Sequence, residues 1–235
     1  MSIKKLVVKN NEKSEVELID FSDLEIDVEN DCSLVLKLAN FGNAENLKIT
    51  ANLGRNSSFD VVFADFSDSN ITINSQVNLN QEGANCRWHL ATLSGHENHK
   101  KFDISFIHHV GHTFALMDNY GVSREKSEII FTGVNHILEG AKGSETAQNA
   151  KIIVFDPEAR GTASPVLRID ENDVKASHGA VVGQLNEDHM FYLMSRGLSK
   201  EEARALITLG YLAPISKQFS EKIQERIMYL IQEAM

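Results

Sequence analysis

The feature that most constrains the fold is a series of short segments in which β-branched or aromatic residues alternate with polar ones, between about Leu34 and Ile169. Alternation of this kind is typical of a strand with one buried face. Clusters of Gly, Asn, Asp and Ser separate the segments roughly every 11 to 16 residues, a rhythm that fits a β-sandwich, a β-barrel or a β-solenoid. The clearest segments are LKITANL, FDVVFADF, NITINSQVNL, FDISFIHHV, SEIIFTGVNHIL and AKIIVFD.

The turns favour the solenoid over the other two folds. Small residues recur where the chain must bend, as in EGANC, EGAKG and PEARG. The dipeptides Asn-Gly and Asp-Gly, which mark tight β-hairpins, are absent. We therefore predict an all-β core of parallel strands coiled as a solenoid over the region from Leu34 to Gly179.

After Gln184 the pattern becomes helical. Asn186 can cap a first helix that ends at Gly197. Ser199 and Glu202 have the spacing of a capping box and open a second helix, which we expect to close near Gly210. The apolar residues of these two helices are Met190, Phe191, Met194, Ala203, Leu206 and Ile207.

A third helix is expected to start at Ser216, because Pro214 interrupts the second one. Its apolar residues recur every fourth position and form one stripe. The stripe consists of Phe219, Ile223, Ile227 and Ile231, with Leu230 beside it. Two interpretations remain open: the stripe covers the end of the β core, as terminal elements of a solenoid do, or it docks another protein.

The composition limits the classes of partner that this chain is expected to bind. The formal net charge of −10 disfavours nucleic acid, and no Lys/Arg block is present to offset it. No apolar run is long enough for a signal peptide or a membrane span, so we expect no membrane partner and a cytoplasmic location. The two cysteines, Cys32 and Cys86, form no CxxC pair and are expected to be reduced thiols.

Enzyme signatures are missing from the sequence. It has no G-x-S-x-G elbow, no GxxxxGK[ST] loop and no HExxH pair, so we expect no catalysis and no nucleotide bound by this chain. His108, His109 and His112 form HHxxH, a pattern that can bind metal. In a strand His108 and His109 point to opposite faces, which favours surface histidines without a metal role. Asp156, Asp170 and Asp173 lie on or near predicted turns, and nothing fixes a glycosidase carboxylate pair.

Between about Leu79 and Pro214 the chain resembles the SufB/SufD family, the β-helical subunits of the Suf iron–sulfur cluster assembly machine. The specific blocks are GAKGSETAQNAKIIV, ENDVKASHG and GQLNEDHMFYLMSRGLS, in that order. The resemblance implies a right-handed parallel β-helix with a C-terminal helical subdomain. It divides the chain into a β-helix core with a short N-terminal lead-in, 1–185, and a helical ATPase-docking region, 186–235. Family members of full length carry an N-terminal helical region, and because the β pattern starts almost at once here, we expect a short form without it.

The resemblance also assigns a site residue. His178 matches the histidine that lies at the subunit interface of D-type members, beside a B-type cysteine, where a transient iron–sulfur cluster is thought to form. The segment where that cysteine would fall, AQNAK from Ala147 to Lys151, contains none, so the chain looks D-like. His178 is thus the expected cluster-binding and metal-binding residue. We expect it where a strand ends, before a tight turn at Gly179.

The resemblance implies two partners. The helices after Asn186 match the region that binds the SufC-like ABC ATPase, and the β-helix pairs with a SufB-like subunit or with a second copy. The function it implies is a non-catalytic subunit of a Suf-type assembly complex. A β-solenoid interaction module that no longer takes part in cluster assembly is the alternative.

Overall fold

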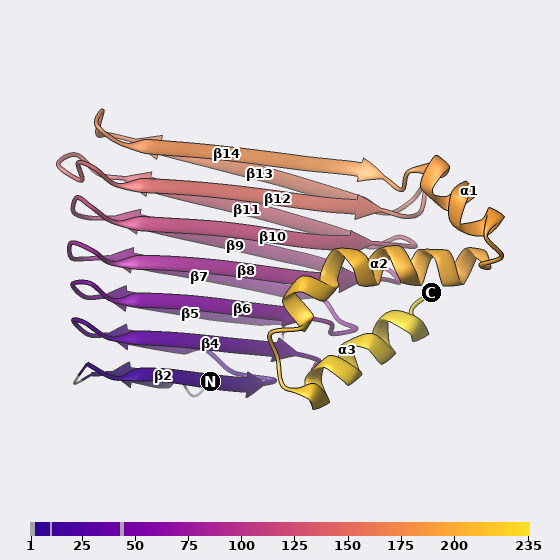
Figure 1. The fold of residues 1–235 in the computed structure, drawn as a ribbon, viewed down its shortest axis with the longest axis horizontal. Coiled ribbons are helices and arrows are strands. Elements are labelled where there is room, and N and C mark those ends of the chain that lie inside the picture. The colour runs from indigo at the N-terminus through magenta and orange to yellow at the C-terminus, as the bar shows by residue number, and fades with distance from the viewer. Residues whose placement is uncertain (1–2, 10, 43–44) are drawn as a thin grey trace.

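The computed structural model describes residues 3–9, 11–42 and 45–235, which form fourteen strands followed by three helices. The strands alternate between two seven-stranded sheets, and each registered pair within a sheet is parallel (Figure 1). Sheet A holds β1 (Lys4–Val8), β3 (Leu24–Val28), β5 (Asn46–Leu53), β7 (Ile71–Leu79), β9 (His99–His108), β11 (Glu128–Ile137) and β13 (Arg160–Ile169). Sheet B holds β2 (Lys13–Ile19), β4 (Ser33–Asn40), β6 (Ser58–Asp65), β8 (Asn85–Ser94), β10 (Phe114–Ser123), β12 (Glu145–Val154) and β14 (Lys175–Gln184).

This arrangement confirms the predicted solenoid. The chain passes from one sheet to the other at each turn, so neighbours within a sheet are two strands apart in sequence. Residues of the EGANC and EGAKG turns carry the bend, since Gly83 and Gly140 adopt φ values of 74° and 86°. Glycine takes such positive φ values without steric cost. The strands extend further than predicted at both ends, from Lys4 to Gln184.

The core lies between the two sheets and is filled by alternate residues of the strands from β3 to β12. In β11, for example, every second residue from Ile129 to Ile137 is buried, and the residues that alternate with them are partly exposed. Aromatic rings join successive coils: the ring centroids of Phe63 and Phe102 are 6.1 Å apart, and those of Phe102 and Phe131 are 5.6 Å apart. The predicted alternation of apolar and polar residues therefore defines the inner and outer faces.

Three helices follow the solenoid: α1 (Glu187–Ser195), α2 (Lys200–Ser216) and α3 (Glu221–Glu233). Asn186 caps α1 by accepting hydrogen bonds from two backbone N–H groups, and Gly197 follows the helix end with a φ of 95°. The capping box of Ser199 and Glu202 is present at the start of α2. These helix starts, and the end of the first helix, are as predicted.

Two predicted boundaries are wrong. Helix α2 continues through Gly210 and Pro214 as far as Ser216, and α3 begins at Glu221 rather than at Ser216. Pro214 removes one backbone donor, but Leu212 and Ile215 on either side of it are buried against the solenoid. Tertiary packing of these two residues offsets the local cost of the proline.

The apolar stripe of the last helix is buried, and it packs on a side of the solenoid rather than on its end. Phe219, Ile223, Ile227 and Ile231 share one cluster with the outward-facing Val62 and Ala91 of sheet B. Figure 1 shows α2 and α3 lying across the ends of the sheet B strands. The interpretation of the stripe as a cover for the end of the β core is therefore wrong.

Candidate functional site

The last coil of the solenoid is uncovered. Strands β13 and β14 are the terminal strands of their sheets, and all ten residues of β14 are exposed. Four apolar side chains on these two strands face solvent for this reason: Val166, Ile169, Val181 and Val182. An edge with exposed apolar residues and unpaired backbone groups is a surface suited to pairing with another chain.

The hydrogen bonds at the two ends of β14 show which of its backbone N–H groups point towards β12. The Lys175 N–H donates to the Ser144 carbonyl at 3.0 Å, and the Leu185 N–H donates to the Val154 carbonyl at 3.1 Å. Because donors alternate along a strand, the N–H groups of the even-numbered residues point away from β12. His178 is one of these residues. In the other edge strand, β13, the N–H groups of Arg160 and Asp170 donate to the neighbouring coil. The odd-numbered positions of β13 therefore face away from it, so the N–H that Pro165 lacks is not needed for the sheet.

His178 lies in the middle of β14, not at a strand end, so that expectation is wrong. The run around it is extended, and Gly179 carries no positive φ that would mark a turn. In register, His178 pairs with Gln148 of β12, which is buried. Residues in register on parallel strands share a face, so the imidazole lies on the inner face of sheet B. It is exposed because no further coil covers it.

The solenoid interior beneath His178 is polar. Gln148, 2% exposed, donates a hydrogen bond of 3.0 Å to the Val166 carbonyl of the opposite sheet. Gly133 leaves room for this side chain, since a Cβ there would clash with the Gln148 Oε1. Asn119 and Asn135 are also buried in this part of the interior. The side chains of the core thus change from aromatic rings to carboxamides towards the uncovered last coil, which we call the open end of the solenoid.

The HHxxH histidines separate as predicted for a strand end, but one of them is not on the surface. His109 and His112 are exposed, whereas His108 is fully buried with its Nδ1 2.7 Å from the Thr113 hydroxyl oxygen. Burial lowers the pKa of His108 to about 4, with a further lowering from the neighbouring His109. The prediction of a surface residue is therefore wrong for His108.

Neither cysteine reaches the open end. Cys32 and Cys86 are both unpaired thiols and both buried. Burial raises the pKa of the Cys86 thiol well above its usual value. Among the residues that the structure describes, no three His, Cys, Asp or Glu side chains are grouped closely enough to hold a metal ion. A metal or cluster bound by His178 would need its remaining ligands from another chain or from sulfide.

The predicted turn acids have structural partners. Burial acts to raise the pKa of Asp156, but the hydrogen bond from the Glu125 N–H and the Arg204 guanidinium of α2, 2.8 Å away, lower it below its usual value. Asp170 lies 2.7 Å from His136, and Asp173 lies 3.3 Å from Lys142. Each of these three carboxylates thus has a different basic partner, in α2, in β11 and in the turn before β12 respectively.

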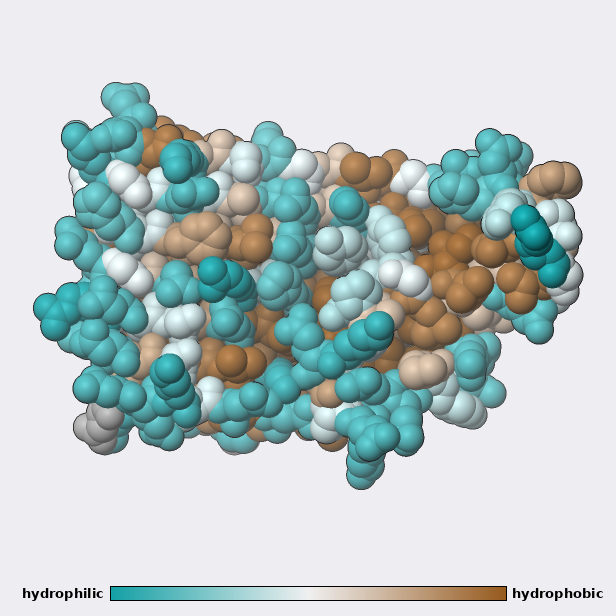
Figure 2. Space-filling model, viewed as in Figure 1, coloured by the Kyte–Doolittle hydropathy of each residue, from teal (hydrophilic) through white to brown (hydrophobic). Residues whose placement is uncertain are grey.

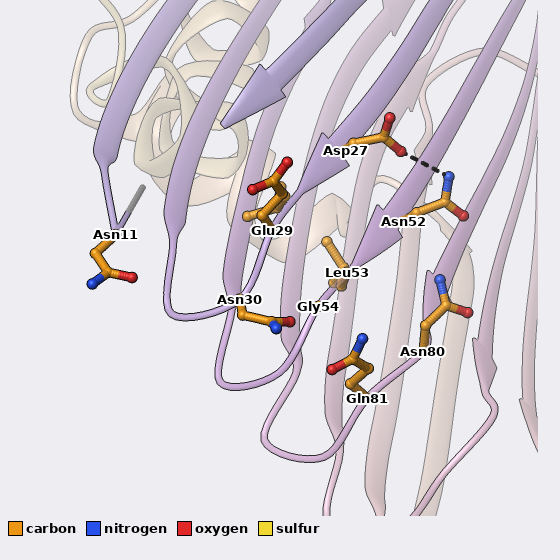
Figure 3. Close-up of a pocket in the computed structure, with 10 residues that line it drawn as sticks. Asn11, Asp27, Glu29, Asn30, Asn52, Leu53, Gly54, Asn80 and Gln81 are labelled. Carbon is orange, nitrogen blue, oxygen red and sulfur yellow. Dashed lines mark hydrogen bonds between the residues drawn. The ribbon is translucent and has the colours of Figure 1, made fainter. Parts of the chain in front are cut away.

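A polar hollow of about 420 Å³ lies along the turns near the N-terminal end (Figure 3). Its side chains are mostly carboxamides and carboxylates from successive coils. Asn52 donates to Asp27 at 3.1 Å, which lowers the pKa of Asp27, and the Asn30 side chain accepts from the Arg55 N–H at 2.8 Å. These contacts hold neighbouring turns together, and the hollow lies far along the solenoid from β14 (Figure 1).

The helices present a second exposed surface. Large apolar side chains face solvent on all three: Phe191, Tyr192, Met194, Leu206, Met228 and Tyr229. Figure 2 shows apolar side chains gathered over the helices at the right of the view. No helix in the described residues is both long and apolar enough to cross a membrane. Exposed apolar groups concentrated in one region mark an interaction surface.

The fold places this chain in the class of β-solenoid proteins that end in C-terminal helices. Residues 6–211 match a family described as SUF system FeS cluster assembly, SufBD core domain. The chain therefore belongs to the SufB/SufD family, as the resemblance of its sequence blocks indicated.

Individual relatives agree with this assignment. The chain is 29% identical over 180 residues to the iron–sulfur cluster assembly protein SufD of Bacillus subtilis, covering 76% of this chain and 41% of that protein. It is 26% identical over 140 residues to SufB of the same organism, covering 60% and 30%. A SufBD family protein of Mycobacterium tuberculosis is 29% identical over 126 residues, covering 54% and 15%. The chain thus spans less than half the length of these relatives.

Proposed function

We propose that this chain is a non-catalytic, SufD-like subunit of a Suf-type iron–sulfur cluster assembly complex. The observation that supports this role best is the position of His178, on the inner face of an uncovered edge strand and above a polar interior. A neutral imidazole is a good ligand for iron. A cluster in transit would be held between His178 and ligands of the chain that covers the open end.

Pairing through the solenoid is the second part of the proposal. The outward N–H groups of β14 and the exposed Val181 and Val182 suit the addition of a strand from another subunit. That subunit is a second copy of this chain or a SufB-like relative. Such pairing would bury His178 and place it at the subunit interface.

Docking of a SufC-like ABC ATPase is the third part. The apolar stripe of α3 is already packed on sheet B, so it supports the docking surface rather than forming it. The exposed residues Leu206, Met228 and Tyr229 on the outer sides of α2 and α3 are the contact candidates. In this division the ATPase binds residues 186–235, and the core, 1–185, carries His178.

The experiment compares His178→Ala with Ser177→Ala in the complex co-expressed with a SufC-like ATPase and purified without oxygen. Ser177 is the neighbour of His178 on the opposite face of β14. We expect His178→Ala to lower bound iron and sulfide at least fivefold while folding and ATPase co-purification persist, because a direct ligand is lost. Ser177→Ala should retain the wild-type content.

Equal iron and sulfide in the His178→Ala complex would reduce His178 to a structural residue. Wild-type complex that binds the ATPase but never acquires iron or sulfide would favour the alternative, an interaction module without cluster assembly.

A further inference from the structure

A small enclosed cavity lies inside the solenoid, beneath its last coil. Its lining comes from four strands and includes Met117 and Asn119 of β10, Phe131 and Gly133 of β11, Gln148 of β12 and Pro165 of β13. The cavity measures about 10 Å³, which is roughly the room that one water molecule needs. A larger ligand does not fit.

One wall of the cavity carries a buried acceptor without a partner. Asn119 is 2% exposed, and among the described residues no group donates a hydrogen bond to its Oδ1. Its neighbours in register, Leu90 of β8 and Ala150 of β12, have apolar side chains that cannot donate. Leaving a buried carboxamide oxygen unpaired costs free energy, so this atom calls for a donor from outside the chain.

A second carboxamide lies on another wall. The Gln148 Nε2 donates to the Val166 carbonyl at 3.0 Å, which holds the side chain across the interior. Its Oε1 lies beside Gly133, in the space that a Cβ at that position would take. The same Cβ would come within 3.1 Å of the Met117 sulfur. Gly133 thus provides the room for a second acceptor oxygen at this cavity.

The lining defines the chemistry of the occupant. Both carboxamide oxygens accept hydrogen bonds, and the Met117 sulfur is at most a weak acceptor. An anion would meet only lone pairs there. In the part of the chain that the structure describes, no His, Cys, Asp or Glu side chain lines the cavity to hold a metal ion. A neutral donor of the size of water remains, and a site with polar partners of this kind is hydrated where an apolar cavity stays dry.

We propose that this cavity binds one water molecule, which donates one hydrogen bond to the Asn119 Oδ1 and the other to the Gln148 Oε1. The water connects β10 to β12 through their side chains. Because Gln148 pairs in register with His178, the interior beneath the open end is hydrated, in contrast to the aromatic core of the earlier coils. The site goes beyond the proposed function and does not depend on it.

A high-resolution crystal structure of the full chain tests the site. We expect a density peak within about 3 Å of both carboxamide oxygens. Asn119→Leu removes one acceptor at nearly the same volume, so the peak should be lost. Asn135→Leu is the matched control, because Asn135 is also buried with an unpartnered Oδ1 but does not line the cavity, and its peak should remain.

Proton NMR of the wild type gives a second measurement that needs no variant. A long-lived water should show a nuclear Overhauser effect to the side-chain amide protons of Gln148, and this effect should be lost in Asn119→Leu. A wild-type crystal without the peak, or a peak that persists in Asn119→Leu, refutes the site. A peak surrounded by ligands at about 2.3–2.6 Å would identify a cation and refute the water. None of these measurements involves iron, so a failure here leaves the proposed function untouched.

Discussion

Lys100 is a buried, ion-paired residue, whereas its neighbour Lys101 lies at the surface. The Lys100 ammonium is fully buried, 2.7 Å from the Asp65 carboxylate and within hydrogen-bond distance of the carbonyls of Ser67 and Leu93. Asp65 in turn accepts from Asn40 and Thr92. Lys101, the next residue, pairs with Asp103 at the surface. The buried network thus joins the ends of three sheet B strands, β4, β6 and β8, to the start of β9 in sheet A.

Breaking this network should be costly. Lys100→Met leaves a buried carboxylate without its counter-ion, and we expect a loss of about 3–5 kcal/mol in the free energy of unfolding. Lys101→Met should cost about 1 kcal/mol or less, because its pair is solvated. Urea titration of both variants measures the difference. Equal losses of unfolding free energy in the two variants would show that the buried Lys100–Asp65 pair is no more important for stability than the solvated Lys101–Asp103 pair.

His108 predicts a pH dependence of stability. Its pKa is lowered to about 4 in the folded chain, whereas an unfolded histidine has a pKa of about 6.5. The unfolded state therefore binds more protons between these values, and the contribution is lost as pH falls from about 6.5 towards 4. We expect a loss of about 2 kcal/mol between pH 7 and pH 5 from this residue.

The measurement is the free energy of unfolding by urea at both pH values, for the wild type and for His108→Gln. The variant should lose about 2 kcal/mol less than the wild type between pH 7 and pH 5, because glutamine does not titrate. The same pH slope in both proteins would contradict the assignment to His108.

At the scale of elements, α3 has one side buried against sheet B and another side exposed. Ile227 is fully buried against sheet B, and the next two residues, Met228 and Tyr229, are exposed. The start of the helix is held by Glu17 of β2, which accepts from the Ser220 N–H at 2.9 Å and from its hydroxyl at 2.7 Å. A carboxylate at this position also interacts favourably with the helix dipole.

Ile227→Ala should therefore lower the free energy of unfolding by about 2–5 kcal/mol, as expected for a truncated core side chain. Met228→Ala should change it by about 0.5 kcal/mol or less. Tyr229→Asp should leave stability unchanged and reduce co-purification of the ATPase. Retained ATPase binding by a Met228→Asp/Tyr229→Asp variant would place the docking surface away from α3.

For the whole molecule, the uncovered coil predicts where hydrogen exchange responds to assembly. The outward N–H groups of Ala176, His178, Ala180, Val182 and Gln184 lack a ladder partner in the single chain. Their exchange should slow as protein concentration or a paired subunit increases. The amides of β8, paired on both sides, should show no such change and provide the internal control. Concentration-independent exchange in β14 would contradict pairing through this edge.

The sequence determined the class of fold, the inner and outer faces and two of the helix starts, because these depend on local patterns. The two-residue period set which side chains point inward, and it places Lys100 in phase with the buried Phe102 and Ile104. The alternation of β9 could therefore have predicted that the Lys100 side chain is buried. The period likewise separated His108 from His109, although it could not tell that the inward position would be fully covered.

Only the tertiary structure decided the rest, because it depends on what each local pattern packs against. The stripe of α3 could equally have faced a partner, and its burial on sheet B follows from the path of α2 across the strands. The turn predicted after His178 did not form, since pairing of β14 with β12 holds the chain extended. The cavity beside Asn119 combines residues from four separate strands, and no sequence period brings those together.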